Sequence, residues 1–341
     1  VQQGAELACD RLRSTIAGLY ECSPEDVFLF SCGMSAVDAA AQAVRRLHPG
    51  RPTAQVGFPY LDSLKVQEKF GHGVTFVPAD ARALQLLSPV VQAQLLAAVF
   101  CEVPSNPLLE SPDIASMSPL LRQQGIPLVV DDVVATPYNI DVSAYADLVV
   151  TSLTKYLSGN GDVMGGAIIC NPASPLHAQL RAIVEAQYEA LLWGDDVIAL
   201  DQQSLGFSER MKRHNEGGET IAERLRGHSA VDTVWYPKWD QGGHYESLRR
   251  PQGGYSSLLS FLVKNPEKNA PRFYDALELC KGPTLGTDFT LVCPYTLLAH
   301  YRELDWAESC GVSRYLIRAS IGIEPPEQIW RRFKAALDIL D

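Results

Sequence analysis

Three short segments carry side chains that could do chemistry, and each of them follows an apolar run. Ser31-Cys-Gly-Met34 follows residues 27–30, Asp131 follows residues 127–130, and Thr151-Ser-Leu-Thr-Lys155 follows residues 147–150. Ligands of open α/β sheets bind at the carboxyl ends of the strands. If the apolar runs are strands of one parallel sheet, the three segments meet at one edge of it.

The first segment could bind an anion. Residues 35–47 are rich in alanine and predict a helix, so Gly33 and Met34 lie at its start. Backbone N–H groups at a helix N-terminus bind phosphate, and a glycine lets the anion approach closely. The alternative is that Gly33 serves only the backbone geometry of the turn. The segment has neither the G-x-G-x-x-G nor the G-K-[ST] pattern, which argues against a nicotinamide-dependent dehydrogenase.

Asp131 and Lys155 could serve a cofactor that has a ring nitrogen and an aldehyde. A carboxylate at a sheet edge needs a partner, and a protonated ring nitrogen would supply one. A lysine between an apolar strand and hydroxyl- and glycine-rich sequence is partly buried, which lowers the pKa of its amine, as a Schiff-base lysine requires. Ser152 and Thr154 could donate to a phosphate. The alternatives are loop or cap roles for Asp131 or Asp132, and a strand-end role for Lys155.

An anion cradle, an acid for a ring nitrogen and a nucleophilic amine, in this order, are what pyridoxal 5'-phosphate requires. We therefore predict this cofactor. The eight cysteines form no C-x-x-C and the histidines show no paired spacing, so no metal site is predicted.

The elements that must position these residues alternate along the chain. Short β-branched runs alternate with amphipathic stretches, which is typical of a mostly parallel sheet flanked by helices. The predicted strands are 27–30, 53–57, 74–77, 97–103, 127–130, 147–150 and 165–170, with helices at 35–47 and 61–70. Beyond residue 210 we expect a helix to 225, strands at 231–236 and 255–263, helices at 273–278 and 326–340, and an exposed loop at 239–254. These patterns predict a large α/β domain over 1–215 and a smaller α+β domain over 216–341.

Composition narrows the classes of protein. The 341 residues include 29 basic and 40 acidic side chains, a formal net charge of −11, which disfavours nucleic acid and anionic membranes as partners. No apolar run approaches the roughly 18 residues of a membrane span, and no signal peptide is expected. We expect a cytoplasmic protein with reduced, mostly buried cysteines that acts on small molecules.

Motifs over nearly the whole chain resemble those of the cystathionine γ-synthase branch of pyridoxal-phosphate enzymes. They are Ser31-Cys-Gly-Met34, Val103-Pro-Ser-Asn-Pro107, Val130-Asp131, Thr151-Ser-Leu-Thr-Lys155, Met164-Gly-Gly166 and Leu316-Ile-Arg-Ala-Ser-Ile-Gly-Ile-Glu324. Three further segments are closer to its fungal members: Gly57-Phe-Pro-Tyr-Leu-Asp-Ser-Leu-Lys65, Gly286-Thr-Asp-Phe-Thr-Leu291 and Cys293-Pro-Tyr-Thr-Leu-Leu-Ala-His-Tyr301. The resemblance implies the pyridoxal-phosphate fold type I and a homotetramer built from dimers, with each active site at a subunit boundary.

The resemblance also implies a role for each matching residue. Lys155 would hold the cofactor and shuttle protons, and Asp131 would keep the ring nitrogen protonated. Tyr60 would stack on the ring and assist proton transfer. The phosphate would be bound by Gly33, Met34, Ser152 and Thr154.

The substrate would be held at its α-carboxylate. The resemblance implies that Asn106 and Arg318 bind this group, with Thr284 nearby. Arginine suits the role because its planar fork grips a carboxylate at two points.

The chain departs from the family pattern at several positions. No Tyr-x-Arg pair, which in the family reaches the phosphate of a neighbouring subunit, precedes Ser31. Asp132-Val133 stands where many relatives have Asn-Thr, and Phe289-Thr-Leu291 where bacterial members have Glu-Ser-Leu. Both changes touch the region expected to meet the incoming nucleophile, so its identity stays open.

The activity implied is γ-replacement on an O-acyl-L-homoserine, with the O-acetyl ester expected. Cysteine as the nucleophile would give cystathionine, whereas a carbon or amine nucleophile would give a non-canonical amino acid of secondary metabolism. Elimination at the γ- or β-carbon, giving a 2-oxo acid and ammonia, uses the same contacts and is the alternative. A catalytically inactive, scaffold-like homologue is the alternative from another class.

Overall fold

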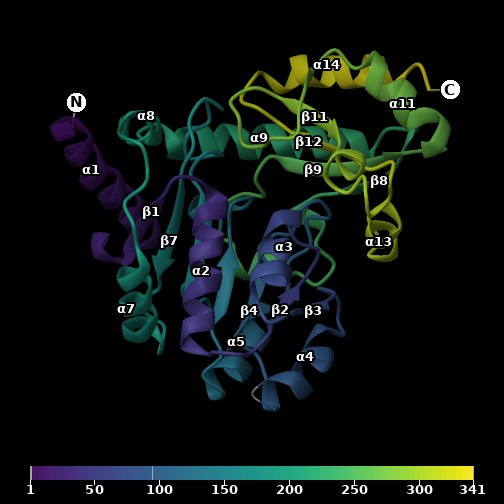
Figure 1. Cartoon of the computed structure of the whole chain (residues 1–341). Coiled ribbons are helices and arrows are strands. Elements are labelled where there is room, and N and C mark those ends of the chain that lie inside the picture. Colours follow the sequence, from purple (N-terminus) through teal and green to yellow (C-terminus); the bar gives the residue numbers. More distant parts are fainter. Residues whose placement is uncertain (1, 94, 341) are drawn as a thin grey trace.

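The computed structural model describes residues 2–93 and 95–340, and a seven-stranded sheet dominates its first half (Figure 1). The strands are β1 (Val27–Phe30), β2 (Thr53–Val56), β3 (Val74–Val77), β4 (Ala98–Glu102), β5 (Leu128–Asp131), β6 (Leu148–Ser152) and β7 (Gly166–Cys170). Their order is β1-β7-β6-β5-β4-β2-β3. Only β7 runs antiparallel to its neighbours, so the carboxyl ends of the other six strands lie at one edge.

Helices cover both faces of this sheet because neighbouring side chains along each strand point to opposite faces. Phe28 and Phe30 of β1 pack in one cluster with residues of α2 and α7, whereas Leu29 packs in the other with residues of α1 and α5. The helices are α1 (Gln2–Tyr20), α2 (Gly33–Leu47), α3 (Leu61–Phe70), α4 (Ala83–Gln92), α5 (Ile114–Gln123), α6 (Thr136–Asn139), α7 (His177–Gln187) and α8 (Gly194–Ser204). The mostly parallel α/β architecture predicted from the sequence is confirmed.

The C-terminal part is a second α+β layer. Its strands are β8 (Val231–Trp235), β9 (Leu258–Val263), β10 (Cys280–Lys281), β11 (Leu291–Pro294) and β12 (Ile317–Ser320), in the order β10-β11-β12-β9-β8. Its helices are α9 (Phe207–Arg226), α10 (His244–Leu248), α11 (Pro266–Ala276), α12 (Tyr295–Ala299), α13 (Leu304–Ser309) and α14 (Pro326–Leu337). Phe261, Phe273 and Phe333 form the centre of its core through edge and stacked ring contacts.

Helix α9 joins the two parts. Its Met211 packs in the core under the large sheet, whereas Ile221, ten residues later, packs in the C-terminal core. The expected division at residue 215 therefore falls inside one continuous helix, and it stays a prediction.

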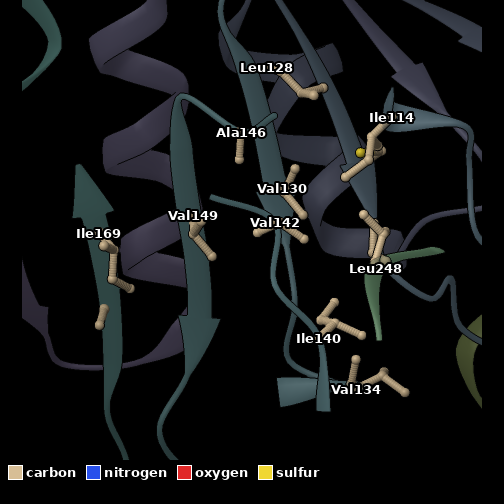
Figure 2. Packing of buried hydrophobic residues seen from close by; sticks show 14 of the residues in the cluster. Ile114, Leu128, Val130, Val134, Ile140, Val142, Ala146, Val149, Ile169 and Leu248 are labelled. Carbon is tan, nitrogen blue, oxygen red and sulfur yellow. The ribbon is translucent and has the colours of Figure 1, made fainter. Parts of the chain in front are cut away.

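Two local expectations are wrong. The segment 239–254 is not one exposed loop, because it contains α10, whose Tyr245 and Leu248 are buried. Leu248 reaches the core beneath the large sheet, near Ile114 and Val130 (Figure 2). The helix expected at 273–278 is α11, which begins earlier because Pro266 occupies its first turn, where proline is tolerated.

Among the described residues, no helix is both long enough and apolar enough to cross a membrane.

Candidate active site

The carboxyl ends of β1 and β6 bring the predicted anion cradle together. Phe30 of β1 and Ser152 of β6 both pair with Gly166 of β7, so the start of α2 lies against Ser152. A Cβ added at Gly33 would lie 2.9 Å from the Cβ of Ser152, closer than real side chains approach. Gly33 is therefore needed for this contact, whatever binds there. Gly33 and Met34 begin α2, where the first N–H groups lack intrahelical partners.

Thr154 is placed differently from the other predicted phosphate ligands. Its Oγ1 accepts a 3.0 Å hydrogen bond from the backbone N–H of Gly165 and donates to the carbonyl of the same residue at 3.3 Å. The Thr154 hydroxyl thus ties the 151–155 turn to the start of β7. The first backbone N–H groups of α2 and the hydroxyl of Ser152 remain as hydrogen-bond donors that suit a phosphate.

Asp131 ends β5 and is partly buried. Its Oδ1 accepts a 2.9 Å hydrogen bond from the backbone N–H of Val133, and burial raises its pKa to about 6. Glu102 ends β4 and is the cross-strand partner of Asp131, so the two carboxyl groups lie on the same face. Burial and Asp131 raise the pKa of Glu102 well above its usual range. Two acids side by side favour a cation, such as a protonated ring nitrogen, as their neighbour.

Lys155 follows β6 and points to the C-terminal part of the chain. Its Nζ donates a 2.7 Å hydrogen bond to Thr284 Oγ1, and burial, followed by the charge of Arg318, lowers its pKa to about 8. Gly286 makes this approach possible: it has a positive φ of 75°, and an added Cβ would lie 2.7 Å from the backbone nitrogen of Tyr156. The lowered pKa leaves a larger neutral, nucleophilic fraction of the amine at a given pH than an ordinary lysine has, which favours condensation with an aldehyde.

Arg318 on β12 is a buried cation, with 3% of its surface exposed. Its Nη1 donates to Asn106 Oδ1 at 3.2 Å, and its Nη2 donates to the carbonyls of Pro283 and Thr284. Its guanidinium lies 4.8 Å from the centre of the Tyr295 ring. The Nε has no partner within the part of the chain that the structure describes. Carboxylates match the planar donor fork of such a group.

Tyr60 stands at the start of α3 and is 41% exposed. Its hydroxyl donates to Asp62 at 3.1 Å, and burial, with Asp62 next, raises its pKa to about 12. Its backbone N–H donates to the carboxylate of Glu102. The charge of the neighbouring Arg318 lowers the same pKa.

The site contains residues that sequence reasoning missed. Glu102 was hidden inside a predicted strand that extended to residue 103, and a charge within an apolar run was the available signal. Tyr295 was only part of a quoted motif, yet its hydroxyl accepts from Asn106 Nδ2 at 3.5 Å. The contact of Tyr295 could not be located without the packing of β11 and β12 onto the large sheet.

Asp132 points away from Asp131 toward α1. The Tyr20 hydroxyl lies 3.0 and 2.9 Å from the two carboxylate oxygens, and Thr151 also bonds to this carboxyl. Burial raises the pKa of Asp132 to about 7. This residue, which replaces the Asn of many relatives, thus links α1 to the strand ends that form the site.

The cysteines and histidines serve no metal cluster among the residues that the structure describes. The cysteines are free, with Cys101, Cys170 and Cys293 buried and Cys280 exposed, so the expectation of mostly buried thiols is only partly met. His300 packs against the rings of Phe58 and Trp306, which also stack on each other.

The folded chain thus places an amine, two neighbouring acids and an anion cradle at one edge of the large sheet, and the second sheet adds the buried guanidinium of Arg318. This is the arrangement of a fold type I pyridoxal-phosphate enzyme. The chain belongs to the family described as Cys/Met metabolism PLP-dependent enzymes, which matches residues 5–338. It is 41% identical over 97% of its length to cystathionine γ-synthase of Neurospora crassa, of which it covers 55%. It is 35% identical over 98% of its length to the L-2-amino-4-chloropent-4-enoate dechlorinase/desaturase of Streptantibioticus cattleyicolor, of which it covers 69%.

Solved structures agree on the fold. The cystathionine γ-synthase of Xanthomonas oryzae in complex with aminoacrylate and cysteine superposes with a TM-score of 0.85 at 27% identity, covering 97% of this chain and 85% of that one. The chain spans little more than half the length of the fungal curated relatives, covering 55% of the Neurospora crassa protein and 56% of the cystathionine γ-synthase-like protein of Aspergillus thermomutatus.

Proposed function

We propose that this protein catalyses γ-replacement on an O-acyl-L-homoserine, with the O-acetyl ester as the expected substrate. The observation that carries the proposal is the amine of Lys155, whose pKa is lowered to about 8 and which lies within hydrogen-bond reach of Thr284, next to the buried Arg318. A relative named cystathionine γ-synthase, 41% identical over 97% of this chain, supports the same reaction class.

Each residue contributes a defined part of the chemistry. Pyridoxal phosphate, when bound, withdraws electrons from the bonds at the Cα of an amino acid attached to it. Arg318 and Asn106 grip the substrate α-carboxylate, which orients the Cα–H bond toward Lys155. The neutral amine of Lys155 would take the proton from Cα and release it again. It would then be free to take a proton from Cβ, after which the acyl group leaves Cγ as a carboxylate.

Asp131 and the anion cradle hold the cofactor. Asp131 would stabilise the protonated ring nitrogen, and the start of α2 with Gly33, Met34 and Ser152 would hold the phosphate. Thr154 supports this cradle through Gly165. Tyr60 covers the ring and excludes water from the reacting face.

The nucleophile that adds at Cγ is cysteine or a carbon or amine compound. Phe289, 41% exposed, stands where bacterial members carry a glutamate, which supports a less polar nucleophile site than theirs. Elimination at the γ- or β-carbon is the second candidate, favoured by the 35% identity to a dechlorinase/desaturase.

Assembly and location are part of the proposal. Exposed apolar side chains near α1 and α8 support a homotetramer built from dimers, which would cover them: Leu7, Leu191, Trp193 and Leu205. The free cysteines fit a reducing compartment such as the cytoplasm.

The test compares nucleophiles directly. The holoenzyme is incubated with O-acetyl-L-homoserine and cysteine, a β-keto ester or a primary amine, and the products are identified by mass spectrometry. We expect a substituted amino acid with one of the nucleophiles and none with Lys155→Ala. Formation of 2-oxobutanoate and ammonia in every mixture would assign the protein to the eliminating enzymes instead.

A further inference from the structure

The carboxyl group of Glu102 connects two loops that come from different strands. Glu102 is the last residue of β4 and is 6% exposed. It accepts hydrogen bonds from the backbone N–H of Tyr60, in the β2–α3 connection, and of Asn106, in the loop after β4. One buried side chain therefore holds the backbone of two residues that lie 46 positions apart in the sequence, from 60 to 106.

The residues held in this way have separate tasks in the proposed site. Tyr60 covers the cofactor ring, and Asn106 contacts Arg318 through a 3.2 Å hydrogen bond from Nη1 to Oδ1. The Asn106 side chain also reaches the Tyr295 hydroxyl. Glu102 contacts the backbone of Tyr60 and Asn106, so its influence on the site passes through these two partners.

The charge of Glu102 is restrained by its neighbour. Glu102 and Asp131 are cross-strand partners at the same sheet edge; Glu102 is buried and Asp131 is partly exposed. The ionised forms of these two neighbouring carboxyl groups repel each other. A cation bound at Asp131 offsets this repulsion and therefore favours the ionised form of Glu102. An ionised carboxylate accepts the two N–H groups more strongly than a neutral one. Cofactor binding at Asp131 would therefore tighten the hold on Tyr60 and Asn106.

We propose that Glu102 is a positioning residue that sets the orientation of Asn106 toward the substrate α-carboxylate and of Tyr60 over the cofactor ring. The proposal rests on the function proposed above. It adds a residue that, through Asn106, favours the binding of amino acids with a free α-carboxylate.

The test measures binding rather than turnover. The holoenzyme is titrated with L-norvaline, which has no leaving group, and with its α-amide, and the absorbance change of the bound cofactor gives a dissociation constant for each. Glu102→Ala should weaken L-norvaline binding about tenfold, the effect expected when Asn106 loses its charge-assisted hydrogen bond to Glu102, and leave amide binding unchanged. The exposed Glu185→Gln on α7 serves as the matched control and should change neither constant.

Two further variants make the result decisive. Glu102→Gln keeps the size of the side chain and one acceptor, so its loss should be smaller and in the same direction, and it replaces Glu102→Ala where that variant does not fold. In an Asn106→Ala background, Glu102→Ala should cause no further loss of preference for the carboxylate. Equal weakening of both ligands, or no change in either, would overturn the proposal. A wild-type holoenzyme that does not respond to L-norvaline at all would instead overturn the proposed function.

Discussion

The Nζ of Lys155 donates a 2.7 Å hydrogen bond to Thr284 Oγ1 across a separation of 129 residues. This contact joins the end of β6 in the large sheet to the loop before β11. It orients an amine whose pKa lies at about 8, and it places that amine beside the carbonyl groups that accept from Arg318. The hydrogen bond is therefore the point at which the two parts of the chain form one site.

Thr284→Val should impair the positioning of the amine. Valine has nearly the shape of threonine but cannot accept a hydrogen bond from Lys155. The variant therefore loses one hydrogen bond to a neutral acceptor, worth about 1 kcal/mol. We expect kcat to fall about tenfold or less, with the fold retained. Steady-state kinetics with O-acetyl-L-homoserine check this, and the exposed Thr75→Val on β3 is the control. Unchanged kcat would show that Lys155 is oriented by other contacts.

Capture of an aldehyde by the apoprotein should depend on pH through Lys155. The amine is protonated and unreactive below its pKa of about 8 and neutral above it, so the rate of reaction with pyridoxal phosphate should rise through pH 8. In Arg318→Met the neighbouring positive charge is gone, so the protonated amine is less disfavoured and the midpoint should move to higher pH. Stopped-flow absorbance over pH 6–11 (roughly the span around a lysine pKa) measures both midpoints. A midpoint that moves to lower pH would contradict this electrostatic assignment.

Gly33→Ala should weaken cofactor binding. The added methyl group would lie 2.9 Å from the Cβ of Ser152, so the start of α2 must move away from the strand end. We expect the dissociation constant for pyridoxal phosphate to rise at least about tenfold, which corresponds to about 1.4 kcal/mol. Equilibrium dialysis of the apoprotein provides the measurement. Gly18→Ala on α1, where an added Cβ meets nothing within 4 Å, should bind the cofactor as the wild type does.

Asp132→Asn should stabilise the fold increasingly as pH rises. The pKa of Asp132 is raised to about 7, so the folded state binds a proton that the unfolded state has already lost above the usual carboxyl range. The contribution of the protonated Asp132 to the free energy of unfolding is complete at low pH and is lost as pH rises toward 7. Above pH 7 the buried charge lowers the free energy of unfolding by on the order of a few kcal/mol. Asparagine avoids this cost and still accepts from Tyr20.

Urea unfolding of this variant at pH 5 and pH 8 (about one to two units either side of the shifted pKa) measures the difference. The gain over the wild type should be larger at the higher pH, and the exposed Asp195→Asn on α8 should show no such trend. A gain that is equal at both values would mean that Asp132 is ionised throughout this range.

Local sequence was sufficient for the residues that act at strand ends. Lys155, Asp131 and Gly33 each follow an apolar run, and because parallel strands align their carboxyl ends, these residues had to meet at one edge of the sheet. The same reasoning predicted most strands of the large sheet within a few residues, since buried strands are continuous apolar runs. It failed at α10, where two buried side chains, Tyr245 and Leu248, are surrounded by glycine, proline and charged residues.

Only the tertiary structure decided how the second half of the chain completes the site. The contacts of Lys155 with Thr284, and of Arg318 with Asn106, depend on the packing of the five-stranded sheet against the large one, and no spacing in the sequence encodes that packing. The tertiary contacts of a carboxyl group at a strand end also decide in which direction it points. Asp131 and Asp132 are adjacent and chemically identical, but Asp131 ends β5 beside Glu102, whereas Asp132 lies just beyond the strand and binds Tyr20 of α1.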